Sequence, residues 1–526
     1  MPFVRNFLLF SILLPMLCGV VSLSLKPGAA RRLTLVAFAA NIAMSAALLA
    51  HIMSAGEGFV YKMGAFPAPF GNEMYAGTLE TLMALVFSAI MLMSVIGGRE
   101  DVERDVIARK QSFFYLMSSF LLAAMLSIIY TNDLFTGYVF IEIITLTACS
   151  IIALKEGGKP LAATMSYLIM SLVGSALLLL AIAVIYSITG HLLVPDLSRS
   201  IDALMQSGDY YIPLVVATGL MTAGVGIKCA LFPFHSWLPD AHAHATTSAS
   251  SILSGLIIKC YLLLLVKVYA RVFTLETVAS LGVGPVLVVF GVAGLVFGSV
   301  TAIRQRDVKQ MLSYSTVSQV GYICIAIGLG SRAGMAAACF HIIAHAAAKS
   351  MLFTAAGGLI RASGRKKSYD ALRGAARRDP ASAAAFICGS LAMVGIPLFS
   401  GFVSKLYTSA ASVGTRFESS AILSVVVVST VLNAMCYFPV VACILAKARD
   451  AGGEEPSAEA VASKRAEALE TGAASDCAEP RRQGARAYAP VGHKPSYVVT
   501  LAAFIIINLG LGIISQPVLA LIEKGI

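Results

Sequence analysis

Residues Phe340–Phe353, which read FHIIAHAAAKSMLF, place two histidines and a lysine inside a run that is otherwise apolar enough for a membrane span. His341, His345 and Lys349 follow one another at intervals of four residues. On an α-helix this spacing turns each side chain by only about 40° from the one before, so the three groups stack along one face over roughly 12 Å. The stretch therefore predicts a membrane helix with one protonatable face.

The rest of the chain has the composition of a multi-pass, all-α integral membrane protein. Of its 526 residues, 58% are hydrophobic and only 13% are charged, too few polar side chains to cover a soluble protein of this size. About fourteen mostly apolar runs are long enough to be transmembrane helices. They are residues 6–24, 32–53, 78–97, 111–130, 134–154, 164–190, 210–234, 246–272, 278–302, 309–331, 333–360, 381–410, 419–446 and 496–520. The first run has no obvious cleavage site and is expected to be a helix rather than a signal peptide.

The distribution of basic residues predicts the orientation of these helices. With the N-terminus outside, 27 Lys and Arg, Lys309 among them, fall in cytoplasmic loops and seven in the opposite loops and termini. Positive loops are retained in the cytoplasm, so we expect a cell-membrane protein with both termini on the outer side. The net charge of +11 is then explained by loop retention, and no basic stripe interleaved with aromatic residues points to nucleic acid.

When the 27 and seven loop and terminal residues are subtracted from the 39 Lys and Arg, five remain, and all five are lysines within predicted spans. A buried lysine can lose its proton while a guanidinium stays charged, so these lysines suit proton exchange. We expect functional roles for Lys228 and Lys259, which lie deep in their spans, as well as for Lys349 and Lys405. Lys267 lies near the end of its span, and there we prefer snorkelling, in which the long side chain reaches the membrane interface.

Glu142 is a carboxylate with several apolar residues on both sides. Because a lone carboxylate inside a membrane is costly unless it is paired or protonated, its natural partner is one of the intramembrane lysines. A structural ion pair that locks two helices is the alternative to a functional one.

Prolines interrupt the seventh and twelfth predicted spans. Pro233 and Pro239 follow Lys228, while Pro397 precedes Lys405. Proline removes a helical hydrogen bond, and broken membrane helices are where transporters place their ion sites. The two breaks lie five spans apart, and the order of proline and lysine is reversed between them, which favours two inverted five-helix repeats.

The histidines have competing interpretations. The HxxxH pair His341 and His345 could hold zinc, but no third ligand is evident, so no metal is expected; one of them could instead only pack. Asp240 and His242 are a candidate proton entrance beside the broken seventh span, with a solvated connection as the alternative. The ten cysteines are scattered, so we expect neither an iron–sulfur cluster nor any other cofactor.

Four segments then carry a family resemblance. They are GIKCALFPFHSWLPDAHAHATTSASSILSGLIIK, RDVKQMLSYSTVSQVGY, FHIIAHAAAKSMLFTAAG and GIPLFSGFVSK. In sequence and in order they resemble the antiporter-like proton-translocating subunits of respiratory complex I (NADH:quinone oxidoreductase). They are also similar to subunits of Mrp-type Na+/H+ antiporters and to membrane subunits of energy-converting hydrogenases. The resemblance covers roughly residues 110–410.

The resemblance implies a proton channel without redox chemistry of its own. In it, Glu142 and Lys228 form an electrostatic switch, and Lys259 is the central lysine. His341, His345 and Lys349 continue the relay to Lys405, the terminal lysine of the broken twelfth helix. The expected function is proton translocation as a subunit of a redox-driven complex, with other membrane subunits and peripheral redox subunits as partners. The alternative is a subunit of an Mrp-type antiporter, which would add sodium to the transported ions.

The predicted segments of the chain follow from these assignments. They are the first three helices (1–110), the first five-helix repeat (111–272), the second, inverted repeat (273–447), a flexible cytoplasmic loop (448–495) and a final transmembrane helix (496–526). The loop has too few large apolar residues to build a core, and a short helix from about Ala458 to Glu470 is expected within it.

Overall fold

The computed structural model describes residues 2–66, 71–415, 417, 419–447 and 492–526. In this part of the chain, twelve helical runs are long and apolar enough to cross a membrane. They are α3 (Pro27–Ala55), α4 (Thr78–Gly97), α6 (Ala108–Tyr130), α7 (Leu134–Ala153), α8 (Gly158–Thr189), α10 (Tyr211–Lys228), the run from α12 to η3 (Thr247–Val272), α15 (Val283–Arg304), α16 (Val308–Gly328), α17 (Arg332–Ala362), α22 (Ser419–Leu445) and α24 (Pro495–Ile513). The all-α membrane architecture is therefore confirmed.

The remaining elements are shorter. Two more apolar helices are α2 (Phe7–Leu23) and α20 (Pro380–Val394), and with them every predicted span contains a helix. The polar or short helices are α1 (Pro2–Arg5), η1 (Met63–Ala65), α5 (Arg99–Asp105), α9 (Val194–Ser207), α11 (Trp237–His244), α14 (Leu275–Ser280), α18 (Tyr369–Leu372), α19 (Ala375–Arg378), α21 (Ser400–Ala411) and α25 (Ser515–Gly525). Strands β1 (Phe59–Lys62) and β2 (Glu73–Ala76) form an antiparallel hairpin. The number of helices that cross the membrane stays a prediction.

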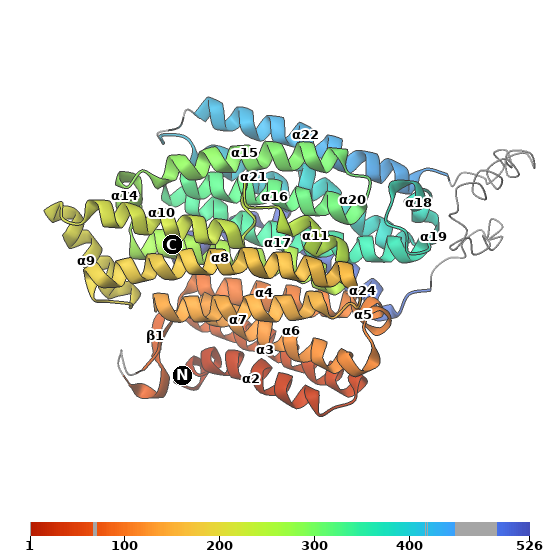
Figure 1. The fold of residues 1–526 in the computed structure, drawn as a ribbon, viewed down its shortest axis with the longest axis horizontal. Helices are drawn as coiled ribbons and strands as arrows, with labels where there is room; N and C mark the ends of the chain where they lie inside the picture. Colours follow the sequence, from red (N-terminus) through yellow and green to blue (C-terminus); the bar gives the residue numbers. More distant parts are fainter. Residues whose placement is uncertain (1, 67–70, 416, 418, 448–491) are drawn as a thin grey trace, which may run out of the picture.

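The long helices lie side by side and give the molecule two ends (Figure 1). Helices α5, α18 and α19 lie at one of them, which we call the α5 end. Strand β1, helices α9 and α14 and both chain termini lie toward the other, which we call the hairpin end. Both termini lie toward the same end, and the side of the membrane that this end faces stays a prediction. The short helix predicted at Ala458–Glu470, and most of the predicted loop 448–495 around it, lie outside the described residues.

The helices that carry Lys259 and the residues His341, His345 and Lys349 are the most buried ones. The apolar windows of the α12–η3 run and of α17 are entirely buried inside the protein, whereas α24 and α22 are mostly exposed at its periphery. In α17, alanine and glycine are frequent, and such small side chains let neighbouring helices approach closely. The relay predicted from the sequence is thus at the centre of the bundle.

Both predicted helix breaks coincide with gaps between helices. Helix α10 ends at Lys228 and α11 begins at Trp237, with Pro233 in the segment between them. Similarly, Pro397 lies between α20 and α21. Pro239 is different, because it lies in the first turn of α11, where proline costs no helical hydrogen bond. The inverted repeats and the segment boundaries stay predictions.

Candidate functional site

Glu142 and Lys228 meet between α7 and the end of α10. Lys228 Nζ lies 3.4 Å from Glu142 Oε1, and its side chain is 0% exposed whereas that of Glu142 is 26% exposed. Lys228 also donates to Thr145 Oγ1 at 3.0 Å, and Ser175 Oγ donates to Glu142 Oε1. The broken helix places this lysine at a C-terminus, where the helix dipole favours a cation. The structure thus brings together the two predicted switch residues.

Lys259 lies deeper, directly after the π-helical segment η2 (Leu253–Ile257). Its side chain is fully buried, and its ammonium donates to the carbonyl oxygen of Ser254. Such π-helical turns occur often at functional sites because they redirect side chains and backbone groups. The lysine therefore has a backbone acceptor but no carboxylate partner among the described ion pairs.

The two histidines of α17 occupy one face, as their spacing predicts. The ring centroids of His341 and His345 are 5.7 Å apart. His341 Nδ1 lies 2.9 Å from Ser404 Oγ of α21, and its ring stacks on Tyr322. Both ring nitrogens of His345 are buried without a protein partner among the described residues, which is costly unless water binds them.

Lys349 and Lys405 end this chain of groups. Lys349 Nζ donates to Leu312 O at 2.8 Å and to Tyr437 Oη at 3.1 Å. Lys405 Nζ donates to Val394 O at 2.7 Å, at the C-terminal end of α20. It also lies 5.4 Å from the ring centroid of Tyr322. Tyr322 therefore contacts both His341 and Lys405 and bridges the relay to the second broken helix.

Asp240 and His242 are not brought together. Both lie on α11, but Asp240 is exposed whereas His242 is fully buried and stacks on Phe353 of α17. Residues two apart on a helix point in different directions, so the carboxylate cannot be a direct partner of the imidazole.

The snorkelling interpretation of Lys267 is wrong. The side chain is only 7% exposed, and its ammonium lies 3.8 Å from Glu80 Oε1. It also donates to Ile129 O and Thr131 O at the end of α6. Arg271 Nη1 lies 2.7 Å from the same carboxylate oxygen of Glu80. In the sequence, the signal for this ion cluster was Glu80, a carboxylate near the start of the predicted span 78–97.

Lys309 is also buried, although its position next to a loop suggested a role in topology. Its ammonium donates to Ala245 O, the C-cap of α11, at 2.9 Å. Asp307 caps the N-terminus of α16, which places Lys309 inside the first helical turn. In the sequence, the signal was Asp307: an aspartate that caps a helix two residues before a lysine places that lysine inside the first helical turn.

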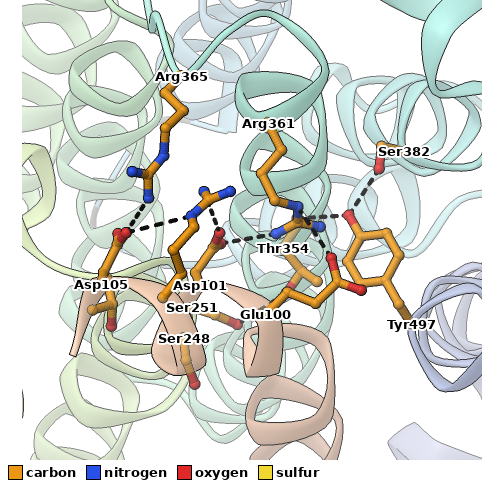
Figure 2. A network of polar contacts seen from close by, with 12 residues as sticks. Glu100, Asp101, Asp105, Ser248, Ser251, Thr354, Arg361, Arg365, Ser382 and Tyr497 are labelled. Atoms are coloured by element: carbon orange, nitrogen blue, oxygen red, sulfur yellow. Dashed lines mark hydrogen bonds and ion pairs between the residues drawn. The ribbon is translucent and has the colours of Figure 1, made fainter. Parts of the chain in front are cut away.

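An ionic cluster closes the α5 end of the bundle (Figure 2). Arg361, at the end of α17, is nearly buried; its Nη1 lies 3.0 Å from Asp101 Oδ2 and its Nε lies 3.4 Å from Glu100 Oε2. Arg365 pairs with Asp105. These contacts fix α5 against the relay helix.

A second ion pair at this end joins the start of α20 to the start of α24. His493 Nε2 lies 2.7 Å from Asp379 Oδ2, and Ser382 N donates to Asp379 Oδ1 at 3.0 Å. Burial raises the pKa of Asp379, but hydrogen bonds from His493 and Ser382 outweigh this effect and hold the pKa below its ordinary value.

A chain of buried hydroxyl groups begins beside the ionic cluster (Figure 2). Thr354 Oγ1 of α17 lies 3.5 Å from Ser251 Oγ of α12 (Thr247–Ile252). Ser251 Oγ is in turn 2.8 Å from Ser94 Oγ of α4. One turn after Ser251, Ser254 Oγ lies 2.9 Å from Thr316 Oγ1 of α16. A hydroxyl both donates and accepts hydrogen bonds, so a proton can pass within each of these two hydrogen-bonded groups, and its passage from Ser251 to Ser254 needs a water molecule between them.

Two relay lysines lie beside the hydroxyl groups and bond to backbone carbonyls rather than to the hydroxyls themselves. Lys259 donates to the carbonyl of Ser254. Thr316 Oγ1 and Lys349 Nζ both donate to Leu312 O, at 3.0 and 2.8 Å. The hydroxyl chain was missed from the sequence, although TTSASSILS (246–254) is an unusual run of hydroxyl residues at the start of an apolar span.

The described residues contain no group of three or more His, Cys, Asp or Glu side chains that could hold a metal ion. What the arrangement offers chemically is a row of buried proton donors and acceptors that lies across the middle of the bundle.

Fold and site together define an antiporter-like membrane subunit, and comparison with known proteins gives its family. Residues 131–433 match the model described as NADH:quinone oxidoreductase/Mrp antiporter, TM. The chain therefore belongs to the NADH:quinone oxidoreductase/Mrp antiporter transmembrane family.

Curated relatives come from both branches of this family. NADH-quinone oxidoreductase subunit N of Desulforudis audaxviator is 34% identical over 425 residues, which cover 78% of this chain and 80% of that protein. An Na(+)/H(+) antiporter subunit of Alkalihalophilus pseudofirmus is 30% identical over 350 residues, which cover 66% of this chain and 68% of that protein.

Solved structures share the fold at lower sequence identity. A chain of the archaeal membrane-bound sulfane sulfur reductase superposes with a TM-score of 0.83 at 22% identity and covers 98% of this chain and 96% of its own length. A chain of the Mrp complex from Dietzia sp. gives a TM-score of 0.82 at 22% identity and covers 100% of this chain and 97% of its own length.

Proposed function

We propose that this chain translocates protons as a membrane subunit of a redox-driven, NADH:quinone oxidoreductase-like complex. The observation that carries the proposal is the Glu142–Lys228 ion pair, with its 3.4 Å separation and its fully buried ammonium. A buried pair of this kind holds a proton on the lysine only while the carboxylate stays close. The 34% identity to an NADH-quinone oxidoreductase subunit N supports the redox-driven branch.

In this proposal, proton transfer starts when the ion pair separates. The carboxylate favours charged Lys228, and separation of the pair leaves an ammonium that burial disfavours. The proton then moves to Lys259. Glu142 is the more exposed partner, and a partly exposed carboxylate in a membrane span is costly. We therefore assign the face around Glu142 to a neighbouring membrane subunit, whose state would change the strength of the pair.

The relay continues through α17 toward Lys405. Neutral imidazole accepts a proton on one nitrogen and releases one from the other, so His345 and His341 can carry protons between lysines. Because the nitrogens of His345 have no protein partner in the described chain, we expect bound water there. Tyr322, which contacts His341 and Lys405, connects the relay to the terminal lysine.

Protons reach the lysines from the α5 end, which the positive loops assign to the cytoplasm. The hydroxyl chain from Thr354 to Thr316 supplies one path. The second candidate entrance is His242, with exposed Asp240 at its surface; because the two do not touch, it requires water between them. Both chain termini then lie on the outer side of the cell membrane.

A subunit of an Mrp-type antiporter is the second candidate function. The 30% identity to an Na(+)/H(+) antiporter subunit favours it, and the same residues would carry the protons. The two candidates differ in the source of energy, which is electron transfer through peripheral redox subunits in the first and an ion gradient in the second.

The test is proton uptake by everted membrane vesicles that contain the complete complex, with electron donor supplied or withheld. Wild type is compared with Lys228→Ala, and assembly of both is checked in the membrane. Uptake that needs the donor and is lost in Lys228→Ala supports the redox-driven subunit. Uptake that follows an imposed sodium gradient without donor supports the antiporter instead. Wild-type uptake by an assembled Lys228→Ala variant would refute the proposed switch.

A further inference from the structure

Glu80 lies at the hairpin end of the bundle with two cations and no second carboxylate among its described ion pairs. Its side chain is 1% exposed, and both Arg271 and Lys267 approach the same oxygen, Oε1, at 2.7 and 3.8 Å. Arg271 is further held by Gly525 O at 2.7 Å and by the face of Tyr75. A guanidinium stays charged inside proteins, whereas an ammonium can give up its proton. Arg271 therefore neutralises Glu80, and Lys267 is the group left free to exchange a proton.

A small cavity adjoins Lys267. It has a volume of about 20 Å³ and is lined by Asp133, Lys267 and Arg271 together with apolar residues of α7 and the α12–η3 run. This volume is enough for about one water molecule, and the charged lining supplies the polar partners that a buried water needs.

A larger pocket shares Asp133 with this cavity and opens at the surface. Its volume is about 460 Å³. The lining includes three carboxylates and an imidazole, those of Glu73, Asp133, Asp196 and His191. The mouth is held in place by backbone bonds, because Asn132 N donates to Glu73 O and Val194 N donates to Asn132 O. Glu73 and Asp196 are each paired with an exposed basic side chain, Lys62 and Arg199. Asp133 has no basic partner among the described ion pairs, so it is the carboxylate of this mouth that attracts cations, including protons.

A third cavity connects the other way, toward the switch. It shares Leu134, Leu264 and Val268 with the cavity at Lys267. Its lining also includes Tyr138 and Val225, which precede Glu142 and Lys228 by about one helical turn. With about 10 Å³ and an almost wholly apolar lining, it is too small and too apolar to hold water stably. This constriction is therefore dry.

We propose that Lys267 is a further proton-exchanging residue, which connects the Glu142–Lys228 switch to the outer surface through the acidic mouth at Asp133. Arg271 positions Glu80, and the apolar constriction between Lys267 and the switch keeps the path closed until water enters it. This inference rests on the proposed function, because it needs Lys228 as the inner donor. It assigns proton exchange with the outside to the hairpin end of the first five-helix segment.

The competing interpretation is a structural ion cluster that joins α4, α13 (Ile258–Lys267) and the C-terminal helix α25. The variant Lys267→Arg distinguishes a structural ion cluster from a proton-exchanging lysine. Arginine keeps the positive charge and the hydrogen bonds of a structural cation, but it cannot release a proton. A second variant, Asp133→Asn, removes the charge at the mouth and leaves the helix cap, because asparagine also caps helices and Asp133 accepts from Thr136 N.

The experiment measures donor-driven or gradient-driven proton uptake by everted vesicles with the complete assembly, normalised to the assembled amount of each variant. Glu276→Gln, an exposed glutamate at the same end, is the matched control. We expect the Lys267→Arg variant to assemble and its uptake rate to be lower than that of wild type by about tenfold or more. Asp133→Asn should lower the uptake rate by about twofold or more. It should also weaken the dependence of that rate on the pH of the vesicle lumen, because the lumen of an everted vesicle corresponds to the outside of the cell.

Wild-type uptake in Lys267→Arg would make Lys267 a structural cation and overturn the inference. If Lys267→Arg does not assemble, Asp133→Asn decides, and an unchanged rate with an unchanged response to lumenal pH overturns the inference as well. Lys228→Ala separates this failure from that of the proposed function. If Lys228→Ala loses uptake while Lys267→Arg and Asp133→Asn keep normal uptake, the proposed path through Lys267 is refuted and the proposed function is not.

Discussion

The substitution Glu142→Gln removes the charge of the switch and keeps its shape and hydrogen-bonding capacity. At 3.4 Å and an effective dielectric constant of about 20, the carboxylate and the ammonium attract each other by about 5 kcal/mol. If only a third of this energy acts at the rate-limiting proton transfer, the rate falls by more than about tenfold, since about 1.4 kcal/mol corresponds to one factor of ten. We therefore expect Glu142→Gln to assemble normally and to lose most of its proton uptake.

The chain offers a matched control for this prediction. Lys110 and Glu156 form an ion pair at 3.0 Å, but both side chains are about half exposed. Such surface pairs contribute little because water screens them, so Glu156→Gln should leave uptake unchanged. The assay is the initial rate of proton uptake by vesicles, measured by quenching of a pH-sensitive dye and normalised to assembled protein. Equal rates for wild type and Glu142→Gln would refute the reasoning that the buried ion pair drives uptake. Equal losses in Glu142→Gln and Glu156→Gln would refute it as well.

Three further predictions follow from other parts of the structure. Thr316→Val keeps the β-branched shape but removes the hydroxyl that bonds to Ser254, so proton uptake should slow. In the control Thr218→Val, the lost hydroxyl bonds to Leu214 O of the same helix, so uptake should not change. Equal rates for the two variants would refute the hydroxyl groups as a proton path. Gly401→Ala would place a Cβ against Ala392 O, well inside van der Waals contact, and should lower stability by about 1–3 kcal/mol in thermal unfolding of the purified chain. Gly219→Ala, whose Cβ would have nothing within 4 Å, should not lower it. Because the pKa of Asp379 is lowered in the folded chain, its ion pair stabilises the protein fully above the ordinary pKa of about 3.9, and this stabilisation decreases as the pH falls toward the lowered pKa of the folded state. Asp379→Asn should therefore lower the melting temperature more at pH 7 than near pH 3; a constant difference at both pH values would contradict this.

The sequence predicted what depends on periodicity and composition. The spacing of His341, His345 and Lys349 placed them on one face of α17, and the prolines located both gaps between helices. The cost of burying Glu142 alone predicted a lysine partner for it, and the family resemblance identified that lysine as Lys228. These inferences succeed because the membrane restricts where charge and irregular backbone are tolerated.

What the sequence did not predict depends on which groups other helices supply. Lys267 was expected at the interface because it is near the end of its span, but the end of α6 provides carbonyl oxygens for it inside the bundle. Glu80 was overlooked, and Lys309 was counted as a loop residue. The hydroxyl chain combines four helices, so no pattern within one span could show that its members meet.

The buried lysines share one structural feature that explains why a membrane protein can hold several of them. The last carbonyl groups of a helix have no partner within that helix, and they carry the negative end of its dipole. Lys405 bonds to the end of α20, Lys267 to the end of α6 and Lys309 to the end of α11. Each ammonium is thus stabilised by fixed, neutral acceptors.

Fixed carbonyls stabilise a lysine by the same amount at every stage of transport, because they belong to the backbone and do not change charge. They can set how readily a proton is held, but they cannot make it move. A switch needs a partner whose position or charge changes. Among the relay lysines proposed from the sequence, Lys228 is the one with a carboxylate within 4 Å in the described chain, and that carboxylate lies on the partly exposed face of α7. Directed proton movement should therefore begin at the Glu142–Lys228 pair, and the carbonyl-bound lysines should follow it.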